Sequence, residues 1–237
     1  AIGGALGFIA AGPLGAGAGG AAGTLAAQMI KKIGNEATNK LLSSREQVRV
    51  GGAIAIAAAH IRSRVDRGER LRSDGYFESA TNGRTDAEEI SEKVLLTTQK
   101  EAEEKKVPYM AFLIGNIAFD SSISAQLGHQ IIKAAESMTY RQLCILKLAA
   151  FKDDYKLRQS DYRGVGSFQK NLYEILYECL DLYHRGFVNF GGEVAFGPTD
   201  VKPGSMTLQA VGADIFQQMG LSTIPSADVQ RIADRLS

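Results

Sequence analysis

Histidine and cysteine are scarce in this sequence. There are three histidines and two cysteines among 237 residues. No pair of histidines has the spacing of metal ligands, so the sequence predicts no metal site. Cys144 and Cys179 belong to no Cys-x-x-Cys motif and make no disulfide framework, which favours a reducing compartment.

Catalytic motifs are absent as well. The sequence has no G-x-S-x-G elbow, no Walker loop and no H-E-x-x-H helix. The carboxylates of Glu103 and Glu104, and of Asp153 and Asp154, are adjacent in sequence. Adjacent side chains point in different directions on a helix, which is typical of surface charge. We therefore expect a protein that is not an enzyme and needs no cofactor.

An excess of one charge is also missing, because 27 basic residues face 26 acidic ones and the net charge is +1. This balance gives no global reason to expect nucleic-acid or membrane-surface binding, so such a partner must be sought in local clusters. The hydrophobic fraction of 45% is that of an ordinary globular chain, of one large domain or two small ones. Because the sequence begins at Ala1, we expect a preceding segment.

Residues 1–30 contain no charge at all, and Lys31 and Lys32 follow directly. Small residues recur there at every fourth position, namely Gly3, Gly7, Ala11, Gly15, Gly19, Gly23 and Ala27. Positions i and i+4 share one helix face, so the repeat predicts a smooth stripe for close helix packing, as in membrane glycine zippers. In water, each glycine would cost a helix about 1 kcal/mol relative to alanine. We therefore expect residues 1–34 to be a membrane or oligomerisation segment.

Three interpretations of this segment stay open. A self-associating membrane helix is favoured, with pore-lining or helix-packing residues Gly7, Gly15, Gly19 and Gly23. A cleaved signal segment fits less well because the lysines follow the apolar run, and a soluble packing segment is the third alternative. A helix of this length would span roughly 45 Å, although Pro13 kinks or divides it. A G-x-G-x-x-G match at residues 15–20 has no preceding strand, so it does not predict a dinucleotide fold.

The body, residues 35–138, has helical periodicity and no strand-like alternation. Capping boxes predict helix starts at Ser44 with Gln47 and at Thr85 with Glu88. The expected helices cover residues 44–72, 85–106, 107–119 and 122–135. The segment 107–119 is the most apolar of the body and is too short to span a membrane, so it predicts the central core helix.

Basic residues gather at the end of the first of these helices: Arg62, Arg64, Arg67, Arg70 and Arg72, offset by Asp66 and Glu69. One interpretation is a solvated helix face. The other is an anion or phosphate site near a membrane surface, with Arg62, Arg64 and Arg67 as candidate ligand-binding residues.

Residues 139–237 change in character. A capping box at Thr139 with Gln142 predicts a helix to Phe151, and an amphipathic helix is expected over 167–185. Residues 187–190 and 193–196, joined by two glycines, predict a tight hairpin, and two further helices end the chain. This order predicts a mainly α protein whose carboxy-terminal α+β domain is winged-helix-like.

A basic and aromatic cluster occupies this domain: Lys152, Tyr155, Lys156, Arg158, Tyr162, Arg163 and Lys170. Cations neutralise phosphates and aromatic rings stack on bases, so these are the main candidate ligand-binding residues. The alternative is an ordinary polar loop, since Asp153, Asp154 and Asp161 dilute the positive charge.

The order of segments resembles the bacterial abortive-infection alpha family over about residues 35–220. The segments that carry the resemblance are the helical VPYMAFLIGNIAFD, the helix TYRQLCILKLAAF and the winged-helix-like end. The resemblance implies a phage-defence effector, and some similar effectors, including those of Hailong-type systems, are membrane channels controlled by a nucleotide or oligonucleotide. It transfers no functional residue to this chain.

The leading hypothesis is a homo-oligomeric effector in the bacterial inner membrane, an ion channel or pore. Its cytoplasmic body would bind a nucleotide or single-stranded oligonucleotide, and its other partners would be membrane lipid and further copies of itself. The alternatives are a winged-helix DNA-binding regulator and a scaffold protein of a defence complex.

Overall fold

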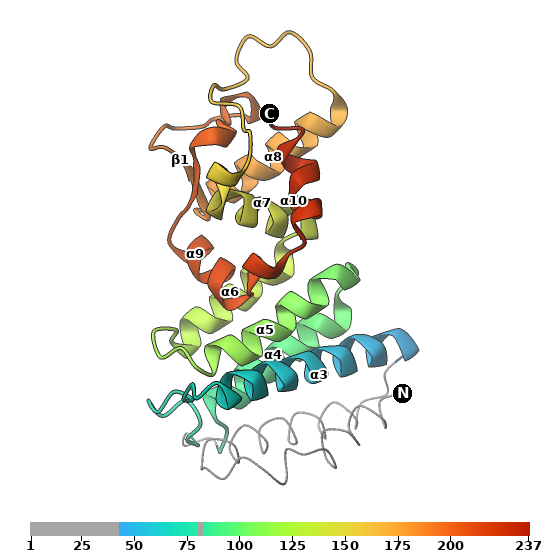
Figure 1. The fold of residues 1–237 in the computed structure, drawn as a ribbon. Coiled ribbons are helices and arrows are strands. Elements are labelled where there is room, and N and C mark those ends of the chain that lie inside the picture. Colours follow the sequence, from blue (N-terminus) through green and yellow to red (C-terminus); the bar gives the residue numbers. More distant parts are fainter. Residues whose placement is uncertain (1–42, 80–82) are drawn as a thin grey trace. The chain divides into compact units, whose positions relative to one another are not determined.

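A computed structural model describes residues 43–79 and 83–237 (Figure 1). The expectations for the glycine-rich segment and for Gly7, Gly15, Gly19 and Gly23 lie outside this range. The described chain is mainly helical with one small antiparallel sheet, as the sequence predicts. It divides into two compact units, the second of which is Met138–Ser237.

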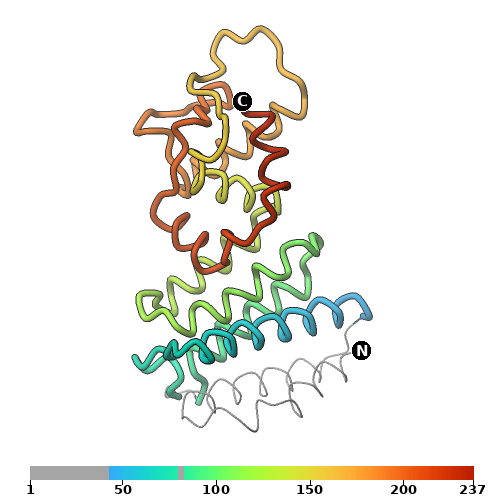
Figure 2. The backbone as a smooth tube through the Cα atoms, in the orientation of Figure 1, coloured from blue at the N-terminus to red at the C-terminus, as the bar shows by residue number. Residues whose placement is uncertain are grey.

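The described part of the first unit is built from helices. They are α3 (Ser44–Asp66), α4 (Asp86–Lys100), the 3-10 helix η2 (Glu104–Lys106), α5 (Val107–Ile117) and α6 (Ala125–Ser137). Helices α3, α4 and α5 lie alongside one another (Figures 1 and 2). The core-helix prediction is confirmed in α5, where Met110, Leu113 and Ile117 are fully buried. Burial of such side chains stabilises each by about 1.5–3 kcal/mol.

The N-cap of the first helix is Ser43, one residue earlier than predicted, and the box at Ser44 with Gln47 is wrong. The amide of Glu46 donates to Ser43 Oγ, and the amide of Ser43 donates to the Glu46 carboxylate over 2.8 Å. An ionised carboxylate is a stronger acceptor than an amide and also complements the positive helix end. The other two predicted boxes, Thr85 with Glu88 and Thr139 with Gln142, are confirmed.

Two helices end earlier than predicted. Helix α3 ends at Asp66 because Gly68 adopts a left-handed conformation, φ +83°, and turns the chain. Helix α4 ends at Lys100 because Glu101 is extended. The carboxylate of Glu101 then forms a largely buried ion pair with Lys106 Nζ at 2.6 Å, which fixes η2 as a separate turn.

Arg72 fastens the loop after α3 to the end of α5. Its side chain is only 4% exposed. Its Nη1 donates to the carbonyl oxygens of Ile117 and Ile123, at 3.3 and 2.7 Å. Its guanidinium lies 4.4 Å from the ring centroid of Tyr76 and pairs with Asp74. This hydrogen-bonded pair lowers the pKa of the Asp74 carboxyl, so Arg72 is a structural residue.

The second unit packs around α7 (Tyr140–Ala150), in which Leu143, Ile145, Leu146 and Leu148 are fully buried. Its other elements are η3 (Lys152–Asp154), α8 (Lys170–His184), β1 (Val188–Phe190), η4 (Pro198–Asp200), η5 (Pro203–Ser205), β2 (Met206–Leu208), α9 (Val211–Gln218), η6 (Leu221–Thr223) and α10 (Ser226–Ala233). Buried Lys147 donates through Nζ to the carbonyl oxygens of Ser222 and Ile224, which ties α7 to the chain around η6.

The predicted hairpin between residues 187–190 and 193–196 is wrong. Strand β1 instead pairs antiparallel with β2, in the register Val188 with Leu208. The chain does turn at the two glycines that follow β1, both of which have positive φ. The amides of residues 196 and 197 then donate to the Asp200 carboxylate, so they make no strand ladder with β1.

Gly115 and Gly212 are among the glycines of the described chain that mark very close packing. A Cβ at Gly115 in α5 would lie 2.6 Å from His60 Cδ2 of α3. A Cβ at Gly212 in α9 would lie 2.0 Å from the carbonyl oxygen of Phe187. Gly52, in contrast, lies inside α3 with nothing within 4 Å of such a Cβ, and the helix runs through it without interruption.

Candidate ligand-binding site

The predicted cations of the second unit lie mainly on the connection between η3 and α8. Three backbone hydrogen bonds position this connection. Arg158 donates to Leu236 and accepts from Gly204, both at 2.9 Å, and the Tyr162 amide donates to Thr199 at 2.8 Å. The segment is therefore an ordered strip of chain held against the end of α10 and the loops around η4 and η5, rather than a free polar loop.

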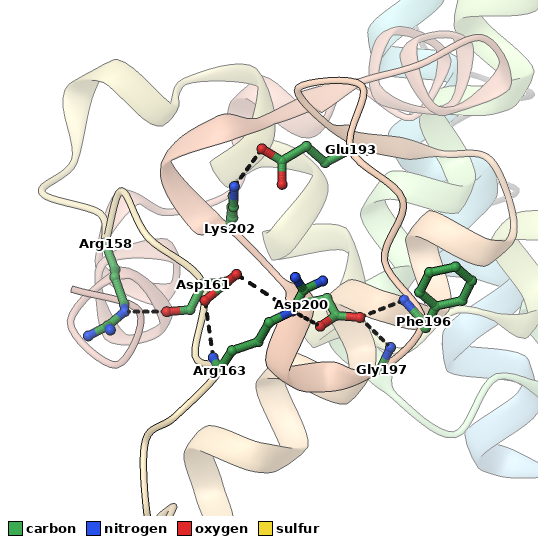
Figure 3. A network of polar contacts seen from close by, with 8 residues as sticks. All are labelled: Arg158, Asp161, Arg163, Glu193, Phe196, Gly197, Asp200 and Lys202. Carbon is green, nitrogen blue, oxygen red and sulfur yellow. Dashed lines mark hydrogen bonds and ion pairs between the residues drawn. The ribbon is translucent and has the colours of Figure 1, made fainter.

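Asp200 is the centre of the polar network in Figure 3. Its carboxylate accepts from Arg163 Nε at 2.6 Å and from the amides of Phe196 and Gly197 at 2.7 and 3.1 Å. The hydrogen bond from Arg163, followed by those from the two amides, lowers the pKa of Asp200. Asp161 accepts a further hydrogen bond from the Arg163 backbone amide, at 3.1 Å. Arg163 is thereby committed to holding two segments together.

Arg158 and Tyr162 form a second, adjoining arrangement. Arg158 Nε donates to the carbonyl oxygen of Asp161 at 3.0 Å, and its guanidinium lies 4.8 Å from the ring centroid of Tyr162. The Tyr162 ring also meets Phe168 edge-on, at 6.0 Å. Tyr162 is buried, and burial raises its pKa to about 12. The ring is therefore a platform for Arg158 and not an exposed surface for base stacking.

The remaining candidates of the cluster are less constrained. Lys156 is exposed, whereas Lys152 and Tyr155 are half-buried. Burial raises the pKa of Tyr155. Lys170 begins α8 with its side chain 93% exposed, 3.9 Å from Glu174. The structure thus spreads these residues over η3, the connection and the start of α8.

The three arginine candidates of the first unit are engaged within the protein. Arg62 pairs with Asp66 at 3.5 Å. Arg64 Nε donates to Glu69 at 2.7 Å, and its Nη1 donates to Asn116 at 2.9 Å. The guanidinium of Arg67 also pairs with Glu69, and these two arginines lower the pKa of that carboxyl. All three guanidinium groups therefore already have carboxylate or amide partners within the first unit.

Metal and membrane features were sought in the part of the chain that the structure describes. No group of three or more histidine, cysteine, aspartate or glutamate residues there has a geometry that would hold a metal ion. Within residues 43–79 and 83–237, no helix is both long and apolar enough to cross a bilayer. Cys144 and Cys179 are buried and form no disulfide, and burial raises the pKa of Cys179 to about 12, which keeps its thiol protonated.

Sequence reasoning missed Asp200 and Lys202, which complete the network. Lys202 Nζ pairs with Glu193 at 2.5 Å and closes the loop that follows β1 (Figure 3). The sequence holds a weak signal for Asp200, because Gly197 and Pro198 precede it in a turn-forming run. No family model, curated protein or solved structure matches the chain, so its function must be argued from its own residues.

Proposed function

We propose that the chain is a homo-oligomeric membrane effector of bacterial abortive infection, without enzymatic activity, that forms an ion channel or pore. The observation that carries this proposal is the uncharged segment 1–30, with its small residue at every fourth position and the lysines that follow. Small-residue stripes allow close helix contact in lipid, where polar backbone groups must be satisfied within the helix. Basic residues after a span favour a cytoplasmic body.

The two units take different roles in this proposal. The first unit, built on α3 and α5, supports the membrane segment and the assembly. The second unit senses a nucleotide or oligonucleotide, because it carries cations that are not committed to ion pairs within the described chain. Binding changes the conductance of the membrane segment, and an open pore depolarises the cell and stops growth.

The experiment replaces Gly15, Gly19 and Gly23 together with leucine. Leucine keeps the segment apolar but removes the smooth stripe, so the variant should stay in the membrane fraction and lose its oligomer and its toxicity on expression. Gly52→Ala is the matched control, because a Cβ there has no atom of residues 43–79 or 83–237 within 4 Å. Undiminished growth arrest and depolarisation by the triple variant would exclude a pore built on this stripe.

A second candidate function is a winged-helix DNA-binding regulator. The order α7, α8, then the antiparallel pair β1 and β2 favours it, since in winged helices the recognition helix precedes the wing. The charge of α8 disfavours it, because this helix carries one lysine, Lys170, and three carboxylates, those of Glu174, Glu178 and Asp181. Salt-dependent duplex binding by the full chain would support this candidate, and no binding at low salt would exclude it.

A further inference from the structure

The guanidinium of Arg158 has partners at its Nε and on one face of its plane, whereas its two terminal nitrogens are open. Its Nε hydrogen bond to the Asp161 carbonyl and its contact with the Tyr162 ring fix the plane of the guanidinium. In Figure 3 its two terminal nitrogens point away from the polar network. Within residues 43–79 and 83–237, those two nitrogens have neither an ion pair nor a hydrogen bond. A fixed guanidinium with an open fork is the geometry that binds two oxygens of one anion.

The carboxylate of Asp161 does not close this fork. Asp161 offers Arg158 only its backbone carbonyl, while its carboxylate accepts from the Arg163 amide at 3.1 Å and lies 3.7 Å from Arg163 Nε. Arg163 in turn is drawn to Asp200 at 2.6 Å. The network therefore engages Arg163 through its Nε and leaves the terminal nitrogens of Arg158 available.

A second cation stands two residues before Arg158 in sequence. Tyr155 has an extended backbone, Lys156 is exposed and Leu157 is buried, and side chains alternate along an extended chain, so we place Lys156 on the same side of the chain as Arg158. Arg235 precedes Leu236, the residue whose carbonyl accepts from the Arg158 amide. Both Lys156 and Arg235 are exposed, and neither has an ion pair in the described part of the chain.

The hydroxyl of Tyr162, the residue whose ring contacts Arg158, lacks a hydrogen-bond partner in the described part of the chain. Tyr162 is 4% exposed, and its Oη is buried with no hydrogen-bond partner among the described residues. A buried polar group left without a partner costs about 1–3 kcal/mol, and native proteins contain few of them. Phenylalanine would give Arg158 the same platform without this cost, so the position is not explained by packing alone.

We infer that Arg158, supported by Lys156 two residues before it, binds a phosphate group through the open guanidinium fork. This inference rests on the ligand-sensing role proposed for the second unit and narrows its candidate residues to this pair. The fork matches two phosphate oxygens, and the ammonium of Lys156 adds charge without a fixed direction. The phosphate belongs to a nucleotide, an oligonucleotide or a lipid headgroup, which share this chemistry.

The test compares binding by the full chain and four variants. The probes are ATP, a fluorescent single-stranded hexathymidylate, and vesicles with or without phosphatidylglycerol, so that the source of the phosphate is assigned. Arg158→Gln and Arg158→Lys should each weaken binding about tenfold to a hundredfold, since lysine keeps the charge and loses the fork. Lys156→Gln should weaken it by about threefold.

Arg231→Gln is the matched control, because Arg231 lies on α10 of the same unit, is 78% exposed and pairs only loosely with Asp228. It should change binding less than about twofold. Equal weakening by Arg231→Gln and Arg158→Gln, or no binding of any probe at millimolar concentration, would overturn the inference. Melting temperatures measured alongside separate a lost contact from a lost fold.

Failure of this site and failure of the proposed function are distinguishable. The Arg158 variants should remain in the membrane fraction as the unaltered chain does. A chain that associates with membranes but binds no phosphate contradicts the site alone. A chain that binds phosphate through Arg158 but never associates with membranes contradicts the membrane effector alone.

Discussion

Arg64 and Arg72 in the first unit have a different role from Arg158 in the second. Arg64 and Arg72 in the first unit donate to side-chain or carbonyl oxygens of residues some 45 to 52 positions away in sequence, and so tie its helices and loops together. Arg158 in the second unit donates one hydrogen bond, from Nε to the nearby carbonyl oxygen of Asp161, and its two terminal nitrogens have no partner among the described residues. Residue type alone does not separate these roles. What separates them is whether a carboxylate or a carbonyl oxygen from elsewhere in the fold reaches the guanidinium.

Among substitutions in the two units, Gly212→Ala in the second should cause the largest loss of stability. Its new Cβ would lie 2.0 Å from a carbonyl oxygen and 2.7 Å from the carbonyl carbon of Phe187. Backbone atoms cannot swing aside as a flexible side chain does, so the free energy of unfolding should fall by about 3 kcal/mol or more. Urea unfolding measures this change in the free energy of unfolding. Gly166→Ala, which meets nothing within 4 Å, should leave stability close to that of the unaltered chain.

Arg72→Ala in the first unit should cause the next largest loss of stability. It removes the donor for the carbonyl oxygens of Ile117 and Ile123 and leaves Asp74 without its ion pair. We expect the free energy of unfolding to fall by about 2–3 kcal/mol. Arg67→Ala, at a side chain 59% exposed, should cost less than about 1 kcal/mol. Equal losses in urea unfolding would contradict the structural role of Arg72.

Alanine substitutions at two glycines of the first unit should change the free energy of unfolding by smaller amounts and in opposite directions. Gly115→Ala should lower the free energy of unfolding by about 1–3 kcal/mol, because its Cβ would overlap the His60 ring. Gly52→Ala should raise it by about 0.5–1 kcal/mol, since alanine is the better helix former and no described residue comes within 4 Å of the new Cβ. Thermal unfolding of both variants checks the signs, and a stabilising Gly115→Ala would show that α3 and α5 are less closely packed there.

The smallest effect concerns the capping box of α3. Hydrogen bonds from Ser43 and then Gln99 lower the pKa of Glu46 to about 2. A lowered pKa in the folded state means that the stabilisation is complete above the ordinary value of 4.5 and is lost as the pH falls from there through about 2. NMR titration of the Glu46 carboxyl measures this pKa. Ser43→Ala should raise it toward 4.5, and an unchanged value would exclude Ser43 as the main cause.

Local signals in the sequence predicted local structure well. The capping boxes at Thr85 and Thr139 and the apolar run of α5 involve residues within one or a few helical turns, and all three are confirmed. The helix ends at Asp66 and Lys100 were missed because a glycine in a left-handed conformation and an extended glutamate interrupt runs that are otherwise helical in pattern.

Long-range pairing was beyond the sequence pattern. Strand β1 pairs with β2, which begins 16 residues after Phe190, and the nearer segment is drawn away by Asp200. In the candidate site, the sequence predicted a basic and aromatic cluster. It did not predict that Tyr162 is buried or that Arg163 is engaged by Asp200, a residue 37 positions away. Both outcomes depend on which distant oxygens the folded chain brings near.

The central claim is that the full chain acts in a membrane through its glycine-rich segment, and vesicle flotation tests it most directly. The purified chain is mixed with vesicles of phosphatidylethanolamine and phosphatidylglycerol, washed at alkaline pH to remove surface-bound protein, and centrifuged through a density gradient. The account predicts that the chain floats with the vesicles and can be crosslinked there into oligomers. A chain that stays at the bottom of the gradient as a monomer would contradict the account.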